Sequence, residues 1–393
     1  MHGNRPWRTI LAQVMVACVM LAACQPGGAT VAPTTAPTEA VVQPTSPPTE
    51  GAIEPTSPPE PQATELVVQT WGGAVQEAED AAFYESFENE TGIDVVQVVG
   101  GGDVMAKLKA MVESGQVEWD VISGWALRDI MRMAEDGLLE PIDYSIVTDT
   151  DSLIGGAKQE YAVAMEVYGV VIAYDVEAYA DNPPISPADF FDLEKFPGNR
   201  AINNWGGPDV AFYYALLADG VPRDQIWTTL QTEEGRARAL RMLDVIKPVL
   251  RTYESGDEMM RLFLDKEVTM GIVLDGRMTK VNSLGGNVGI IWDNGLLDPA
   301  YWGVLKNAPH REAAMEFINY ILNPEAQAVY TQHIFYSTSN TRAAEYLPEE
   351  LRLSASTSPD NLARLHVWTF EESTLVGGLL PTFLEDWNAW LSE

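Results

Sequence analysis

A tryptophan and two glycines form a corner between two unlike segments near residue 70. Residues 66–70 are apolar and typical of a strand, whereas the segment after Trp71-Gly72-Gly73 is charged and typical of a helix. An indole ring offers a flat face for stacking and for contact with a cation. Glycines let a backbone approach a neighbouring group closely. The chemistry of this corner is therefore that of binding.

The sequence lacks the patterns that carry common catalytic chemistry. G-x-S-x-G, H-E-x-x-H and G-x-x-x-x-G-K-[ST] are absent from the body of the chain, so hydrolase, zinc-protease and phosphate-loop functions lack their residues. Residues 100–103 (GGGD) lack the third glycine of a dinucleotide fingerprint and indicate a turn. The histidines are far apart and have no carboxylate at metal-ligand spacing: His2, His310, His333 and His366. We expect no metal, no cofactor and no enzyme activity.

Strand-like and helix-like segments alternate along the chain. Strands are expected at 66–70, 93–99 and 119–123, each followed by a segment with apolar residues at helical spacing. The same alternation continues with expected strand segments at 168–175, 200–207, 267–276, 288–293 and 301–306. Short links between alternating elements indicate an α/β sheet with helices on its faces. The final segment places Phe383, Trp387, Trp390 and Leu391 on one helical face, which we interpret as core packing.

The charge balance limits the partners. The 393 residues include 57 acidic and 24 basic side chains, for a net charge of −33. Nucleic acid and an anionic membrane surface would both require an excess of Lys and Arg. The acidity fits the solubility of a secreted protein, and it also fits an acidic cleft that attracts cations.

The N-terminus resembles a bacterial lipoprotein signal. Arg5 and Arg8 precede an apolar stretch that ends in the sequence LAAC at Cys24. This pattern implies a signal peptide over residues 1–23 and a lipid anchor on Cys24, with an uncleaved signal anchor as the alternative. Residues 24–65 are rich in Pro, Thr and Ser and predict a disordered tether. The protein is then expected outside the cell, anchored on the outer face of the cytoplasmic membrane, at the cell surface or in a periplasm.

Several stretches of the body resemble one family in the same order. They include TWGGAVQEAEDAAFYESFENETGIDV, SPADFFDLEKFPGNRA, EVTMGIVLDGR, IIWDNGLLDPAYWGVLKNAPHREAAMEFINYILNPEAQA and FYSTSNTRA. These stretches are similar to extracellular solute-binding proteins of ABC importers, in the branch of spermidine/putrescine-binding proteins. The resemblance covers residues 66–393. It implies a monomer that delivers a small solute to ABC permease subunits.

The resemblance implies a type II periplasmic-binding-protein fold. Two doubly wound α/β lobes would be joined by a hinge, with the ligand in the cleft between them. The implied first lobe comprises residues 66–167 and 274–308, and the second comprises residues 168–273 and 309–393. This agrees with the rule that doubly wound sheets bind ligands beyond the carboxyl ends of their strands.

The resemblance also points to individual binding residues. Positions that match those of the polyamine binders are Trp71, Ser123, Asp275, Tyr301 and Trp302, and two further residues, Trp125 and Asp209, lie close to such positions. Two positions depart from the pattern, because Ala74 replaces a tyrosine and Leu274 replaces a tryptophan. Because each departure removes an aromatic side chain, both weigh against a polyamine as the solute.

A cationic solute requires carboxylates for its ammonium groups and aromatic faces for its methylenes. Further candidates for these roles are Glu166, Tyr168, Trp205 and Tyr336. Arg277 would instead bind a carboxylate, so an amino-acid-like, opine-like or sugar ligand remains open beside the polyamine-like one. A sensory receptor that presents its ligand to a membrane kinase is the other function left open.

Overall fold

The computed structural model describes residues 63–101, 103–204 and 208–393. The predicted signal peptide, the lipid anchor at Cys24, most of the predicted tether and the candidate Trp205 lie outside these residues. Within the described ranges, no helix combines the length and the apolar character needed to cross a membrane.

Three parallel strands build the first part of the sheet, as the alternating sequence predicts. They are β1 (Glu65–Thr70), β2 (Asp94–Val99) and β3 (Val121–Ala126), in the order β2-β1-β3. Their helices are α1 (Gly73–Glu79), continued by a π-helical turn (Asp80–Tyr84) into α2 (Glu85–Thr91), then α3 (Val104–Ser114) and α4 (Leu127–Glu135). Strand β3 therefore ends where α4 begins.

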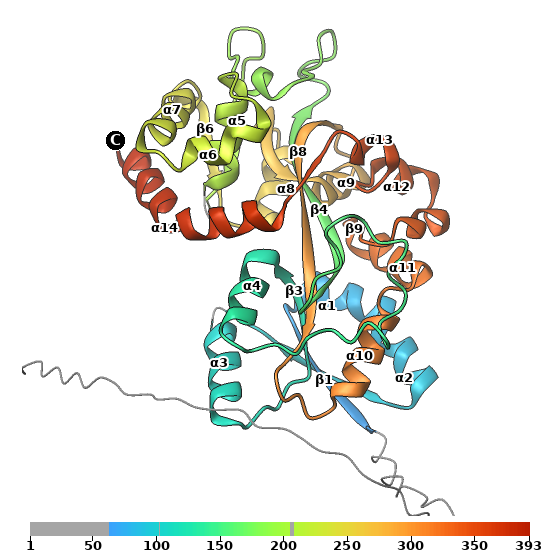
Figure 1. Cartoon of the computed structure of the whole chain (residues 1–393). Helices are drawn as coiled ribbons and strands as arrows, with labels where there is room; N and C mark the ends of the chain where they lie inside the picture. Colours follow the sequence, from blue (N-terminus) through green and yellow to red (C-terminus); the bar gives the residue numbers. More distant parts are fainter. Residues whose placement is uncertain (1–62, 102, 205–207) are drawn as a thin grey trace, which may run out of the picture. The chain divides into compact units, whose positions relative to one another are not determined.

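Two long antiparallel strands connect this part of the sheet to the rest. They are β4 (Val163–Asp175) and β8 (Val288–Val304), which pair from Val163↔Trp302 to Asp175↔Val288. One end of β8 also pairs with β3, and the far end of β4 pairs with β7 (Met270–Leu274). The sheet continues through β5 (Arg200–Asn203) to β6 (Leu250–Tyr253). Figure 1 shows β4 and β8 running between the two groups of helices.

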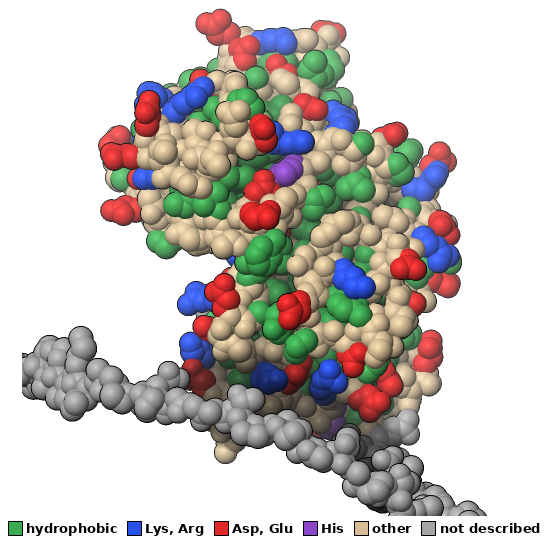
Figure 2. All heavy atoms as spheres, viewed as in Figure 1, with side chains coloured by type: hydrophobic (Ala, Val, Ile, Leu, Met, Phe, Trp, Pro, Cys, Tyr) green, Lys and Arg blue, Asp and Glu red, His purple; other side chains and the backbone are tan. Residues whose placement is uncertain are grey.

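The remaining helices cover the two parts of the sheet. They are α5 (Asp209–Ala218), α6 (Ile226–Leu230), α7 (Glu233–Leu243), α8 (Gly256–Leu264), α9 (Asp275–Ser283), α10 (Arg311–Tyr320), α11 (Pro324–Ile334), α12 (Glu349–Ser354), α13 (Pro359–Leu362) and α14 (Phe370–Ser392). Two short strands, β9 (Ser337–Thr338) and β10 (His366–Val367), pair with β4 and β8. Figure 2 shows acidic side chains scattered over one face, with Lys and Arg among them, rather than gathered into one patch.

The packing of three helices differs from the lobe boundaries that the sequence predicts. Helices α10 and α11, predicted in the second lobe, pack against the first: Phe317 of α10 lies 5.0 Å from Phe87 of α2 between ring centroids, and α11 contacts α1. Helix α9, predicted in the first lobe, packs against α8. The boundaries between the lobes therefore lie later in the chain than the sequence predicts, because each apolar helix face packs on the sheet surface nearest to it.

The last helix contacts helices that pack on both parts of the sheet. The first half of α14 lies against α4, where Thr374 Oγ1 is 3.8 Å from Met131 Sδ. Its second half packs on α5, with the ring of Phe383 5.5 Å from that of Phe212. Trp387 is buried and donates a hydrogen bond from Nε1 to Asn204 Oδ1 at 2.8 Å. Helix α14 thus fixes α5, the helix that begins at Asp209.

Replacing Trp387 with alanine tests this packing. The change removes a buried indole, which costs about 3–5 kcal/mol of unfolding free energy, and it leaves Asn204 Oδ1 without its donor. Leu384→Ala in the same helix is the matched control, because Leu384 is 37% exposed. Urea denaturation followed by circular dichroism measures both variants. Equal losses of stability in the two variants would contradict the packing role.

Candidate solute-binding site

A cavity of about 190 Å³ lies between α4 on one side and β4, β5, β7 and α5 on the other. A smaller cavity of about 40 Å³ adjoins it and shares Arg128, Asp209 and Asp298. Pockets for drug-sized ligands commonly measure roughly 300–1,000 Å³. The space therefore suits a solute with few heavy atoms.

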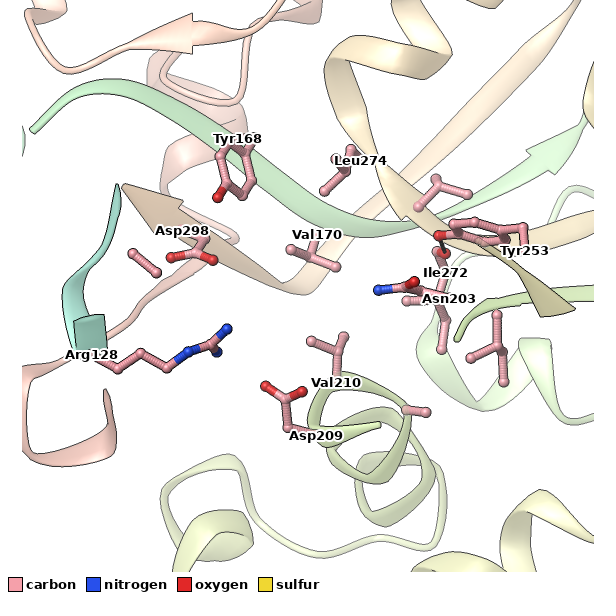
Figure 3. Close-up of a pocket in the computed structure, with 14 residues that line it drawn as sticks. Arg128, Tyr168, Val170, Asn203, Asp209, Val210, Tyr253, Ile272, Leu274 and Asp298 are labelled. Carbon is pink, nitrogen blue, oxygen red and sulfur yellow. Dashed lines mark hydrogen bonds between the residues drawn. The ribbon is translucent and has the colours of Figure 1, made fainter. Parts of the chain in front are cut away.

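Arg128 enters the cavity from the first turn of α4. Strand β3 ends at Ala126 and α4 starts at Leu127, so the second helical residue lies at the carboxyl end of the sheet. Figure 3 shows the guanidinium of Arg128 directed between the carboxylates of Asp298 and Asp209. Among the described residues, Arg128 has no hydrogen bond and no ion pair within 4.0 Å. Its five N–H donors suit a carboxylate, which they can bind in a bidentate manner.

Two carboxylates face this arginine from different elements. Asp209 is the first residue of α5, and half-buried Asp298 lies on β8 opposite Tyr168 of β4. Burial raises the pKa of Asp209 to about 6, while Arg128 and the backbone N–H groups of Asp209 and Val210 lower it. Burial also raises the pKa of Asp298 to about 7, against the field of Arg128 and with a further increase from Asp209. A cationic group placed between them would stabilise both charged forms.

The opposite end of the cavity has no charged side chain among the described residues of its wall. Ile202 and Ile272 supply aliphatic side chains there, and Val170 and Val210 lie between this end and the charged residues. Asn203 and Tyr253, the last residues of β5 and β6, close this end, and Tyr253 Oη donates a hydrogen bond to Ile272 O at 2.7 Å. Figure 3 shows this end well separated from the three charged side chains.

The predicted aromatic corner is present at the end of β1. The rings of Trp71 and Trp125 lie 5.0 Å apart between centroids, and Trp71 Nε1 donates to Ser123 O at 2.8 Å. Trp125 Nε1 donates to Gln69 Oε1 at 2.9 Å. Trp71 remains 39% exposed. Gly124, at a φ of 69°, sits so close that an added Cβ would be 3.0 Å from Trp71 Nε1, which explains the absence of a side chain there.

Two buried glutamates lie behind this corner. Glu166 accepts a hydrogen bond from Tyr330 Oη, and burial raises its pKa. Glu79 of α1 accepts hydrogen bonds at Oε2 from Thr70 and from Tyr84, the latter at 2.9 Å. Burial raises the pKa of Glu79 to about 8, and Glu166 raises it further, against the lowering effect of these hydrogen bonds. Burial thus favours the neutral form of Glu79, and its hydrogen bond with Thr70 fixes the end of β1 just before Trp71.

The other candidates from the sequence lie at different places. Tyr168 and Asp209 line the cavity. Tyr301 donates a hydrogen bond to Gly156 O at 2.8 Å, and fully buried Trp302 packs edge-on against Phe83. The expected stacking face of Trp302 is thus occupied by the core.

Asp275, Arg277 and Tyr336 form a group around the start of α9. Asp275 Oδ1 accepts a hydrogen bond from the Gly169 N–H at 2.9 Å, and burial raises its pKa to about 7. Arg277 Nε donates to Tyr336 Oη at 3.0 Å and Nη1 lies 3.7 Å from Asp257 Oδ1. The ring of Tyr336 is 5.6 Å from that of Tyr168. This group supports the wall of the cavity behind Tyr168.

Two charged residues of the cavity, Arg128 and Asp298, were missed in the sequence. The signal for Arg128 was its place in the first helical turn after the third strand. Asp298 follows two leucines inside a strand, where its side-chain direction depends on the pairing of β8 with β4. No group of three or more His, Cys, Asp or Glu side chains suited to a metal ion occurs in the described part of the chain.

Comparison with known proteins relates this cavity to a class of transporters. Residues 82–356 match the family described as bacterial extracellular solute-binding protein. The chain belongs to this family. It is an ABC substrate-binding protein for a small solute, and proteins of the family act in transport rather than catalysis.

Individual relatives carry different ligands in their names. The γ-aminobutyric acid-binding protein of Pseudomonas aeruginosa is 33% identical over 303 residues, covering 77% of this chain and 85% of the relative. The Escherichia coli spermidine/putrescine-binding periplasmic protein is 23% identical over 284 residues, covering 70% and 79%.

Solved structures agree with the two-lobed type II fold. The Atu4243 GABA receptor has a TM-score of 0.73 at 30% identity and covers 83% of this chain and 97% of its own. The binding protein MotA of A. tumefaciens B6, in complex with glucopine, has a TM-score of 0.69 at 30% identity and covers 83% and 99%.

The buried acid Glu79 predicts a pH dependence of stability. Its pKa is raised in the folded state. Its contribution to the free energy of unfolding is therefore fully present below the ordinary glutamate pKa and is lost as pH rises toward about 8. Glu79→Gln mimics the neutral acid and should flatten the fall in melting temperature between pH 5 and pH 9. Glu77→Gln, on the exposed side of the same helix, should leave the wild-type profile unchanged. An identical decline in the Glu79→Gln variant and the wild type would contradict this assignment.

Proposed function

We propose that this binding protein captures a small solute that carries both a carboxylate and an ammonium group, an amino-acid-like zwitterion. The observation that supports this proposal is the placement of Arg128 between Asp209 and Asp298 in the cavity (Figure 3). A guanidinium binds a carboxylate with charge-assisted hydrogen bonds, and two aspartates can receive an ammonium group. The γ-aminobutyric acid-binding relative adds support, since its named ligand carries the same two groups.

Capture would bring the two sides of the cavity together. Arg128 lies on α4, which follows the first three strands, and Asp209 lies on α5 at the other side. A zwitterion that contacts both groups bridges these elements, which favours a closed arrangement over an open one. We further propose that the closed protein, as a monomer, delivers the solute to ABC permease subunits.

A polyamine-like solute, the first prediction from the sequence, remains the second candidate. Asp209, Asp298 and the half-exposed Trp71 favour a cation. Arg128 weighs against it, because a like charge in a partly buried cavity repels an ammonium group. Titration of the wild type and of an Arg128 variant with both kinds of solute separates the two candidates.

Arg128→Met provides that test. Removing the guanidinium should lower the affinity for a zwitterion such as 4-aminobutyrate by about 10–100-fold, from the loss of a charged hydrogen bond. The same change should leave or raise the affinity for putrescine, because the repulsion disappears. Isothermal titration calorimetry measures both solutes against both proteins.

The control for this experiment is Arg132→Met, one turn further along α4 and outside the cavity, which should bind like the wild type. Binding of putrescine by the wild type without binding of any amino acid would refute the zwitterion and support the polyamine.

We also propose that Cys24 carries the lipid that holds the protein on the outer face of the cytoplasmic membrane. In cells fed a clickable fatty acid, the wild type should be labelled and should sediment with membranes. Cys24→Ala should lose the label, whereas Cys18→Ala should keep it, since Cys18 lies within the proposed signal peptide. Labelling of the Cys24→Ala variant would exclude this anchor site.

A further inference from the structure

The charges that line the cavity are all at one end. Among the described residues in its wall, the charged side chains are Arg128, Asp209 and Asp298. Figure 3 shows the Arg128 guanidinium between the two carboxylates, and the aliphatic side chains of Val170 and Val210 separate this group from the far end. The arrangement presents a positive and a negative partner within one small region.

The far end offers no charge of its own within the described wall. It is formed by Ile202, Ile272, Asn203 and Tyr253, and the Tyr253 hydroxyl already donates to Ile272 O. Tyr253 and Ile272 are each 2% exposed. A charged group of a ligand placed here would lose its water without gaining an opposite charge, which costs several kcal/mol. A hydrocarbon chain placed here would gain from burial.

These two ends fit a particular spacing of charges in the solute. In an α-amino acid, the carboxylate and ammonium groups share one carbon, so both lie at the same end of the molecule. In a diamine or an ω-amino acid, the charges are at opposite ends of the chain. We propose that the cavity holds both charges of its solute at the Arg128 end and an uncharged side chain at the Asn203 end, which makes α-amino acids with aliphatic side chains the solute class.

This inference rests on the proposed function, namely that the solute is a zwitterion, and it narrows that function. It differs from what the name of the γ-aminobutyric acid-binding relative suggests, because that ligand carries its charges at opposite ends. The volume of about 190 Å³ agrees with a short side chain.

Pairs of isomers test the spacing directly. Norvaline and 5-aminopentanoate contain the same atoms and the same two charges, and they differ in where the ammonium group is attached. The same holds for 2-aminobutyrate and 4-aminobutyrate. Calorimetric titration of the wild type should give a dissociation constant roughly tenfold or more lower for the 2-amino isomer of each pair, because a charge at the Asn203 end is desolvated without gaining an opposite charge.

An isosteric change at the far end should reverse the preference. Asn203→Asp adds a carboxylate there without changing the volume of the side chain, so the ratio of the two dissociation constants should shift toward 5-aminopentanoate. Melting curves establish that the variant is folded, and the two isomers serve as controls for each other.

The outcomes are distinct. Equal or tighter binding of the ω-amino isomers by the wild type would overturn this inference and leave the proposed function standing. A ratio unaffected by Asn203→Asp in a folded variant would also overturn it. Failure of all four zwitterions to bind would overturn the proposed function together with the inference.

Discussion

The pairing of β4 with β8 is the interaction on which the rest of the structure depends. These two strands run antiparallel from one part of the sheet to the other, and β3 and β7 attach at their opposite ends. Tyr168 and Asp298 face each other across this pair, so the register of the strands sets the position of one carboxylate in the cavity. A shift by one residue would turn Asp298 to the other face of the sheet.

Several carboxyl groups of the protein are buried. Glu79, Asp209, Asp275 and Asp298 all have pKa values raised by desolvation, and each is held by a different surrounding. Glu79 and Asp275 accept hydrogen bonds from fixed groups and serve the structure. Asp209 and Asp298 instead face the Arg128 guanidinium and the open cavity. The same physical effect therefore supports the scaffold at two positions and prepares a site at two others.

Much of the fold could be predicted from the sequence, because apolar periodicity and strand–helix alternation reflect local constraints. Two separate strands were predicted at 288–293 and 301–306, whereas β8 runs without a break from Val288 to Val304, with Asn294 at a φ of 57°. The pairing with β4, which is distant in sequence, maintains the strand. The lobe membership of α10 and α11 depends on similar long-range contacts.

The site was predictable only in part, for the same reason. The resemblance pointed to Trp71, Ser123 and Trp125, which lie together because β1 and β3 are neighbours in the sheet, but none of them lines the cavity. Arg128 was missed although it occupies an equivalent position, since a lone arginine in a helical turn looks like a solvated residue until the opposite wall is known. Trp302 was predicted to face the cleft but is buried in the core. An aromatic residue in a strand has the same sequence pattern whether it faces the core or a cleft.

The three charged residues of the cavity belong to three separate elements, which has an evolutionary consequence. Arg128 and Asp209 each occupy the first turn of a helix, and Asp298 is one residue of a long strand. None of them forms an ion pair within 4.0 Å with the others among the described residues, so a single codon change alters the electrostatics of the cavity without removing a contact that the sheet requires. A protein of this kind can change the solute that it binds through substitutions at its cavity residues while its folding stability stays nearly constant.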